Sequence, residues 1–167
     1  MPSDSPFHIR PARQGDAALV LGLIRDLAAY EKLSHEVVAT EQDIDAQLFG
    51  AQPRAEALIA EYNGQPVGFA LFFHNFSTFL ARPGLYLEDL YVKPEFRGKG
   101  FGKKLLAHLA KLAVERGCGR FEWAVLDWNT PAIRFYESLG AKIVDEWKIN
   151  RLTGDALRKL AQTAAVQ

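Results

Sequence analysis

The chain has 167 residues, of which 49% are hydrophobic and 24% charged, a composition typical of a globular domain with its own core. Its net charge of zero argues against a general nucleic-acid binder, and its one cysteine, Cys118, excludes an internal disulfide and a cysteine metal cluster. No apolar run is long enough to span a bilayer, and residues 1–6 do not resemble a signal peptide. We therefore expect a cytoplasmic protein without metal, membrane or nucleic-acid partners: one domain over residues 7–162, with flexible termini at 1–6 and 163–167.

The first 50 residues predict one strand and two helices. A short alternating strand over Phe7–Pro11 ends at the proline. Apolar residues at three- and four-residue spacing predict a helix over 17–32, which Asp16 can cap. A second, shorter helix follows Thr40, which begins a capping-box pattern, and Gly50 ends it.

The pattern then changes to strands. Residues 57–62 and 67–73 flank Asn63-Gly64, a pair typical of a tight hairpin turn, and a loop over 76–84 precedes a strand over 85–92. The remaining residues predict, in order, a helix over 98–116 stopped by Gly117, a strand over 121–126, a helix over 131–139, a strand over 141–149 and an amphipathic helix from Thr153. Strands interleaved with helices around a hairpin-rich middle indicate an α/β fold with a mixed sheet.

Three glycines, Gly98, Gly100 and Gly102, lie between a predicted strand and the start of a predicted helix. A helix N-terminus has unpaired N–H groups and a partial positive charge, and glycines let a phosphate approach those groups closely. Arg97 and Lys103 add positive charge beside them. The glycines are also compatible with a plain tight turn, so the motif alone is weak evidence for a phosphate ligand.

The spacing of this turn excludes two common phosphate loops. A Walker loop ends in Lys followed by Ser or Thr, but neither follows Lys103. A dinucleotide-binding fingerprint counted from Gly98 places Lys103 where its third glycine belongs. Both alternatives therefore fail on register.

The segment Arg97–Gly102 does fit the R-x-x-G-x-G motif of the GCN5-related N-acetyltransferase (GNAT) family, and the resemblance extends from Phe7 to about Gln162. Within the family the chain resembles the diamine (spermidine/spermine) acetyltransferases, and most of all their thialysine acetyltransferase branch, in the segments Tyr30–Leu33, Leu85–Asp89, Ala124–Asn129 and Phe135–Ala141. The resemblance implies a GNAT fold, a single twisted mixed sheet flanked by helices and splayed at an acetyl-CoA cleft. It also implies a homodimer.

The resemblance further implies which residues bind acetyl-CoA. One strand would align the acetyl-pantetheine arm and the glycine turn would hold the pyrophosphate, through Leu90, Tyr91 and Val92 and through Arg97, Gly98, Lys99, Gly100, Phe101, Gly102 and Lys103. Asn129 would contact the coenzyme near its pantetheine portion, together with Thr130, Pro131 and Ala132. From the residues alone Asn129 is more readily the N-cap of the next helix, and the two roles are compatible.

Acetyl transfer to an amine needs a neutral nitrogen and a proton for the departing thiolate. A free alkylamine has a pKa of about 10.4, so a carboxylate reached through water has to accept its proton. We expect Glu88 to bind the substrate ammonium and relay that proton. Tyr136, with a phenol pKa of about 10, is suited to protonate the thiolate, and the resemblance assigns this role to the tyrosine at its position. Without the resemblance, core packing would be the more usual role of Tyr136.

Glu88 and Asp89 lie at the centre of an otherwise apolar strand. Adjacent strand residues face opposite sides, so both can face one ligand only through a bulge, which the resemblance implies in this strand. A structural salt bridge is an equal alternative for Asp89, because a buried carboxylate is costly without a partner. The amine pocket implied by the resemblance contains Tyr30, Glu31, Glu88, Asp89, Glu122, Trp123, Ala124 and Asp145.

The loop before Leu85 departs from the diamine enzymes. Thr78 stands where a carboxylate would attract a polyamine, and Phe79 where tryptophan is usual. We therefore expect direct acetyl transfer, in a ternary complex, to the primary amine of a small cationic substrate: thialysine or another lysine-like amino acid, a diamine or a polyamine, with a preference for short ones. The alternatives are acetylation of protein Lys or N-termini, and a non-catalytic CoA-binding regulatory module.

Overall fold

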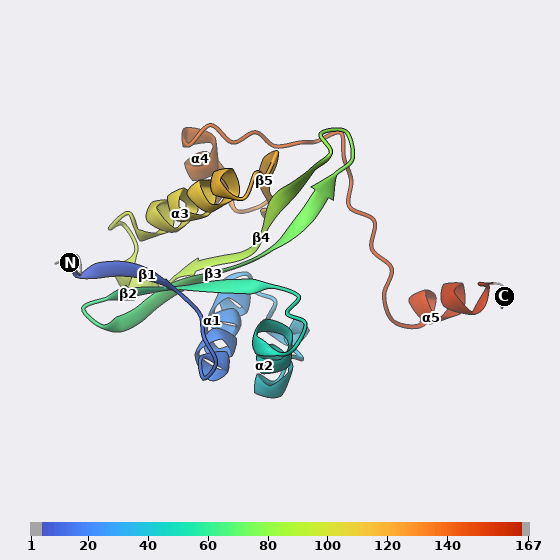
Figure 1. Cartoon of the computed structure of the whole chain (residues 1–167), viewed down its shortest axis with the longest axis horizontal. Helices are drawn as coiled ribbons and strands as arrows, with labels where there is room; N and C mark the ends of the chain where they lie inside the picture. Colours follow the sequence, from blue (N-terminus) through green and yellow to red (C-terminus); the bar gives the residue numbers. More distant parts are fainter. Residues whose placement is uncertain (1–4, 165–167) are drawn as a thin grey trace. The chain divides into compact units, whose positions relative to one another are not determined.

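The computed structural model describes residues 5–164, which fall into two compact units divided between Ala124 and Val125. The first unit is a five-stranded sheet with helices on both faces (Figure 1). Its strands lie side by side in chain order: β1 Phe7–Pro11, β2 Glu56–Tyr62, β3 Gln65–Ser77, β4 Arg82–Val92 and β5 Arg120–Trp123. The pairs from β1 to β4 are antiparallel and β5 joins β4 in parallel, so the sheet is mixed, as predicted.

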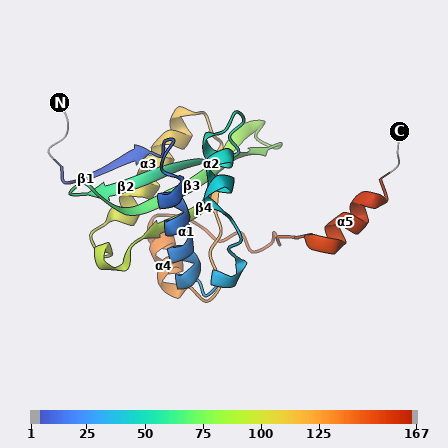
Figure 2. The same ribbon diagram turned by 90° about the horizontal axis from the view of Figure 1, so that it is seen from below.

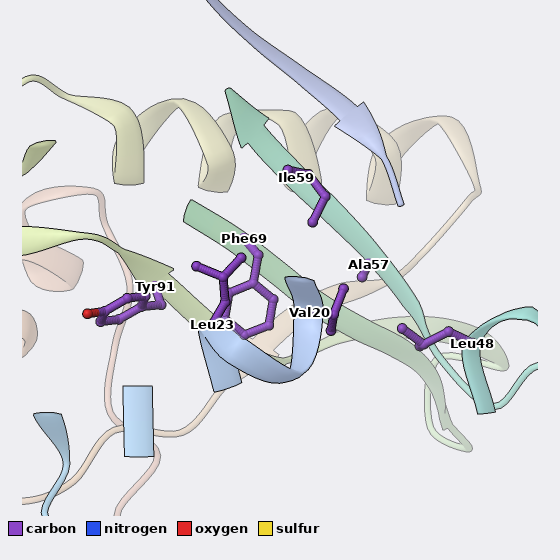
Figure 3. Close-up of a cluster of buried hydrophobic side chains, with 7 residues drawn as sticks. All are labelled: Val20, Leu23, Leu48, Ala57, Ile59, Phe69 and Tyr91. Atoms are coloured by element: carbon purple, nitrogen blue, oxygen red, sulfur yellow. The ribbon is translucent and has the colours of Figure 1, made fainter. Parts of the chain in front are cut away.

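Helices α1 (Ala17–Tyr30) and α2 (Glu41–Phe49) lie on one face of this sheet, and α3 (Phe101–Glu115) lies on the other (Figures 1 and 2). Two single 3-10 turns, η1 (Ser34–Glu36) and η2 (Pro94–Phe96), follow α1 and β4. The apolar faces of α1 and α2 meet the sheet in one buried cluster of Val20, Leu23, Leu48, Ala57, Ile59, Phe69 and Tyr91 (Figure 3). Each large side chain buried in this way stabilises the fold by about 1.5–3 kcal/mol, which holds α1 against β3 and β4.

Local signals in the sequence specify several of these boundaries. Asn63 and Gly64 both have positive φ angles, 50° and 76°, which a tight turn of the primed type between β2 and β3 requires. Thr40 and Asp43 form the reciprocal hydrogen bonds of a capping box at the start of α2. Gly117, with a φ of 71°, ends α3 in a Schellman motif. These three predictions are confirmed.

Other predictions about the ends of elements were wrong in part. Asp16 stands at the start of α1 but makes no capping hydrogen bond, because its carboxylate accepts from the Arg10 guanidinium at 2.7 Å. The predicted loop over 76–84 is mostly strand, since β3 and β4 continue to Ser77 and from Arg82. The third helix begins at Phe101 rather than at 98, because the preceding turn contains glycines with left-handed backbone.

The second unit consists of α4 (Thr130–Ser138), a segment without regular structure, and α5 (Gly154–Gln162). Gly140, with a φ of 92°, ends α4, and the Ala141 N–H donates to the Tyr136 carbonyl at 3.2 Å. The predicted strand over 141–149 does not form. A strand needs a partner for its backbone groups, and the described part of this unit contains no other strand.

Within residues 5–164, no helix is long and apolar enough to cross a membrane. The same part of the chain holds no group of three His, Cys, Asp or Glu side chains arranged for a metal ion. Of the predicted flexible termini, residues 1–4 and 165–167 lie outside the described residues.

Candidate active site

Strand β4 has one edge that no described strand covers over its last residues. Its pairing with β5 stops at Leu87, whereas its pairing with β3 continues to Val92. The Lys93 N–H donates to the Val67 carbonyl at 2.8 Å, which extends the ladder with β3. Bonded and non-bonded pairs alternate along antiparallel strands, so the N–H and C=O groups of Leu90 and Val92 point away from β3, toward the uncovered edge.

This edge can accept an extended polar chain as an added strand. Leu90 and Val92, both predicted to align the acetyl-pantetheine arm, present their backbone groups to it. By the same alternation the backbone of Tyr91 faces β3. The Tyr91 ring lies at one end of the buried cluster, with its hydroxyl pointing away from the other six side chains (Figure 3).

The glycine-rich turn connects this edge to α3. Gly98 and Gly100 have φ angles of 77° and 80°, a backbone conformation that favours glycine. The first hydrogen bond of α3 runs from the Lys104 N–H to the Gly100 carbonyl at 3.0 Å, and no side chain caps the helix. The N–H groups of residues 101–103 therefore have no acceptor within the helix, which is the arrangement that binds an anion.

The space around the turn also fits a phosphate ligand. A Cβ atom built at Gly98, Gly100 or Gly102 would have no other heavy atom within 4 Å beyond its chain neighbours. Gly102 is the informative one, because its φ is not positive and neither strain nor packing requires glycine there. Lys99 and Lys103 are exposed beside it. Unpaired donors, positive charge and open space together fit the pyrophosphate of a coenzyme.

Phe101 anchors the turn rather than facing this open space. Phe101 is 5% exposed, and its ring stacks on Phe7 of β1, with centroids 4.2 Å apart. The Lys104 ammonium lies 4.9 Å from the Phe7 ring centroid. These contacts hold the start of α3 against β1, so the turn is attached to the sheet at both ends.

The predicted bulge in β4 is confirmed at Glu88. Leu71 pairs with Asp89 and Phe72 pairs with Leu87, so Glu88 is the extra residue. One extra residue reverses the face to which the following side chains point. Asp89 therefore shares a face with Leu71, which packs against the buried cluster beneath α1.

Three carboxylates gather near the point where α1 ends. Burial, then the negative charges of Glu88 and Glu31, raise the pKa of Asp89 to about 6. Burial also raises the pKa of Glu31, which caps the C-terminus of α1. Within residues 5–164 none of the three has an ion-pair partner, so the salt bridge considered for Asp89 is absent. A cationic ligand would relieve this repulsion.

The predicted pocket residues at β5 differ from these three carboxylates, because the one acid among them has an ion-pair partner. Glu122 forms an ion pair with Arg120 at 2.6 Å, and the Asn75 side-chain amide donates to it at 3.5 Å. Trp123 packs on Phe121, with ring centroids 4.9 Å apart. Ala124 follows as an exposed residue at the end of the first unit. The Glu122 charge is thus compensated within the protein, unlike those of the other three acids.

Arg97 has contacts that the sequence did not predict. Its Nε donates to the Val92 carbonyl at 2.9 Å. Its guanidinium lies 4.8 Å from the ring centroid of Tyr30 and 5.4 Å from that of Tyr91. Tyr30 is far away in sequence, so no local spacing could have indicated this contact.

The other predicted residues belong to the second unit. Asn129 is at the N-cap of α4 but makes no capping hydrogen bond, and Thr130, Pro131 and Ala132 form the first turn. The partly buried Tyr136 lies on α4 beside Phe135, with ring centroids 5.6 Å apart. Asp145 is exposed in the segment that follows α4. The roles assigned to these residues stay predictions.

Comparison with known proteins agrees with this geometry. Residues 24–141 match the Acetyltransferase (GNAT) family. The chain belongs to this family. It is 43% identical to the thialysine N-epsilon-acetyltransferase of Sus scrofa, over 92% of the chain and 96% of that protein. It is 35% identical to the L-ornithine N5-acetyltransferase NATA1 of Arabidopsis thaliana, over 91% of the chain and 86% of that protein.

The fold has counterparts among solved structures. An integron cassette protein from the mobile metagenome of V. cholerae is 28% identical, with a TM-score of 0.80, over 95% of this chain and 99% of that one. The predicted family and α/β fold are confirmed, and the chain is an acetyl-CoA-dependent N-acetyltransferase.

Gly102→Gln tests the glycine turn. The new side chain enters open space without backbone strain, so we expect stability to be kept or raised by up to about 1 kcal/mol and affinity for acetyl-CoA to fall at least about tenfold. Thermal unfolding and calorimetric titration measure the two effects. Gly22→Gln is the matched control, because Gly22 in α1 also has open space and no positive φ. Equal affinities in both variants would contradict a coenzyme site at the turn.

Asp89→Asn tests the carboxylate cluster. Because the pKa of Asp89 is raised in the folded state, the native protein binds more protons, and stability falls as pH rises from about 4 to 6. At pH 7.5 we expect the variant to be more stable than the wild type by about 1–3 kcal/mol, and the difference to vanish near pH 4. Denaturant unfolding at both pH values measures it. The exposed Glu146→Gln should follow the wild type. If the stability of Asp89→Asn changed with pH as that of the wild type does, the carboxylate cluster would be refuted.

Proposed function

We propose that the chain transfers acetyl groups from acetyl-CoA to the primary amine of a small cationic molecule, such as thialysine, ornithine, lysine or a short diamine. The observation that carries this proposal is the set of acids without ion-pair partners, Glu31, Glu88 and Asp89. Asp89 and Glu88 lie in the strand whose free edge follows at Leu90. A cationic acceptor drawn to these acids is thereby delivered to that edge.

The acetyl donor is held by the same strand and by the turn that follows it. Acetyl-CoA supplies the acetyl thioester when it is bound. In this proposal the backbone groups of Leu90 and Val92 align the acetyl-pantetheine arm, and residues 98–103 hold the pyrophosphate. Asn129 and the first turn of α4 contribute further contacts to the coenzyme.

The proton chemistry follows from the charges in the cluster. Glu88 is exposed at the bulge, so it can attract the substrate ammonium and pass its proton to water. Asp89, with a pKa of about 6, is a suitable acceptor near neutral pH. The neutral nitrogen then forms a bond to the acetyl carbon, and the carbon–sulfur bond breaks. Tyr136 donates its phenolic proton to the departing sulfur, and the proton that the attacking nitrogen loses on becoming an amide returns through water to the Tyr136 phenolate.

An amine panel tests the substrate class. Thialysine, ornithine, lysine, putrescine, spermidine and a lysine-containing peptide are offered with acetyl-CoA, and released thiol is measured. We expect the short amines to be preferred, and Glu88→Gln to lower their kcat/KM at least about tenfold, mainly through KM. The exposed Glu41→Gln should behave as the wild type. A preference for the peptide favours protein acetylation, and no amine-dependent thiol release favours a regulatory module.

Tyr136→Phe tests the proposed acid. A lost proton donor should lower turnover by about 100-fold or more and leave the dissociation constant for acetyl-CoA within about twofold. Steady-state kinetics and calorimetry measure the two quantities. Tyr62→Phe is the control, because Tyr62 packs its ring against Phe96 and Phe101 away from the carboxylates. Unchanged turnover in Tyr136→Phe would rule out this role.

We also propose a cytoplasmic homodimer, as the resemblance implies. In the second unit large apolar side chains are exposed, and association would bury them: Ile143, Val144, Trp147, Ile149, Leu157 and Leu160. The mass of the protein in solution tests the dimer.

A further inference from the structure

The Arg97 guanidinium occupies two positions that the proposed reaction needs. Its Nε–H bonds to the Val92 carbonyl, and its Cζ atom lies over the rings of Tyr30 and Tyr91. These contacts join the end of β4 to the last residue of α1. One side chain therefore links the strand of the acetyl donor to the helix of the amine pocket.

The first position is a hydrogen-bond acceptor on the uncovered edge. The Val92 carbonyl points away from β3, and within residues 5–164 no β5 partner reaches it. A carbonyl in this place is most stable with a donor. Arg97 supplies an N–H group at 2.9 Å. An amide N–H of an extended ligand would have to take the same acceptor.

The second position is a cation site. Arg97 places a positive charge on the face of the Tyr30 ring, next in sequence to Glu31. Glu31 is one of the three carboxylates that have no ion-pair partner. A substrate ammonium drawn by these acids would use the same aromatic face.

We propose that Arg97 is a placeholder, whose contacts with the Val92 carbonyl and the Tyr30 ring are given up when the acetyl donor binds. This inference rests on the proposed function. The displaced guanidinium leaves an aromatic face open to the amine, so donor binding favours amine binding. Arg97 is a positioning residue in this scheme, and its charge remains available to the pyrophosphate.

A phosphate-free donor separates these two roles of Arg97. S-acetylpantetheine carries the amide arm without phosphates, and its binding to the full chain is measured by NMR titration. Arg97→Met keeps the apolar stem but lacks the charge and the donor. We expect it to bind S-acetylpantetheine about three- to tenfold more tightly than the wild type, the range for removing one competing hydrogen bond. The exposed Arg13→Met should be neutral. Equal or weaker binding by Arg97→Met would overturn the proposal.

A second readout follows Arg97 directly. Its Nε–H signal, assigned by its loss in Arg97→Lys, should be shifted by the two tyrosine rings in the free enzyme. Addition of CoA should return the signal toward that of an exposed arginine. A signal unmoved by saturating CoA would refute displacement. Both NMR measurements use no acceptor, so they stand even if the proposed amine substrates fail.

The last measurement is the coupling between CoA binding and amine binding. In the wild type, CoA should increase the affinity for the best amine of the panel at least about fivefold. In Arg97→Met the amine should bind with nearly the same affinity with and without CoA. Full coupling in Arg97→Met would show that Arg97 does not connect the two sites.

Discussion

The site depends on the backbone hydrogen bonds that β4 does not make with β5 beyond Leu87. A strand next to two others normally satisfies its N–H and C=O groups on both sides, and groups left unpaired are costly when water is excluded. Here β3 continues to bond one edge of β4 to Val92, while the other edge is open among the described residues. The open edge passes directly into η2, the glycine turn and α3. Because the sheet is interrupted here, the unpaired backbone groups of β4 are followed along the chain by a helix N-terminus with unpaired N–H groups.

The bulge at Glu88 uses the same strand for a second purpose. In a regular strand, with Glu88 paired, Asp89 would share the face of the buried Leu85 and Leu87, among apolar side chains. The insertion turns it toward the end of α1 and Glu31. The bulge therefore lets an otherwise apolar strand carry charged side chains, immediately before the open edge. In the proposed function, the acceptor and donor halves of the reaction would be built from consecutive residues.

Two groups of acids in this protein differ in environment. Asp16 and Glu61 share Arg10, Glu56 bonds Arg116, and these partners lower the pKa of each carboxyl group. For Asp89 and Glu31 burial and neighbouring charge raise it instead. The carboxylates of the first group each have an arginine partner, whereas those of the cluster have no ion-pair partner in the described part of the chain. Their burial and repulsion lower the stability of the fold. Uncompensated charge of this kind is typical of a binding site.

Much of this arrangement could be predicted from the sequence, because its signals are local. Asn63-Gly64 and Gly117 need positive φ, and the glycine turn specifies its own backbone. The bulge and the pocket role of Glu31 came from family resemblance, since alternation alone puts Glu88 and Asp89 on opposite faces. The strand expected over 141–149 does not form, because periodicity describes a single segment, whereas a strand also needs a second strand to pair with. Arg97 on Tyr30 was missed for the same reason, as its contact joins distant segments.

The length of the acceptor amine follows from where the charges lie. Thr78 and Phe79 differ from the diamine enzymes, but both are exposed at the tip of the hairpin between β3 and β4. From Arg82 at the base of that tip to Glu88, six strand residues span about 20 Å. Within one chain a short amine held at the bulge cannot reach the tip. In the proposed function the substituted positions therefore do not weaken its binding, and the acids nearest the open edge would select the amine.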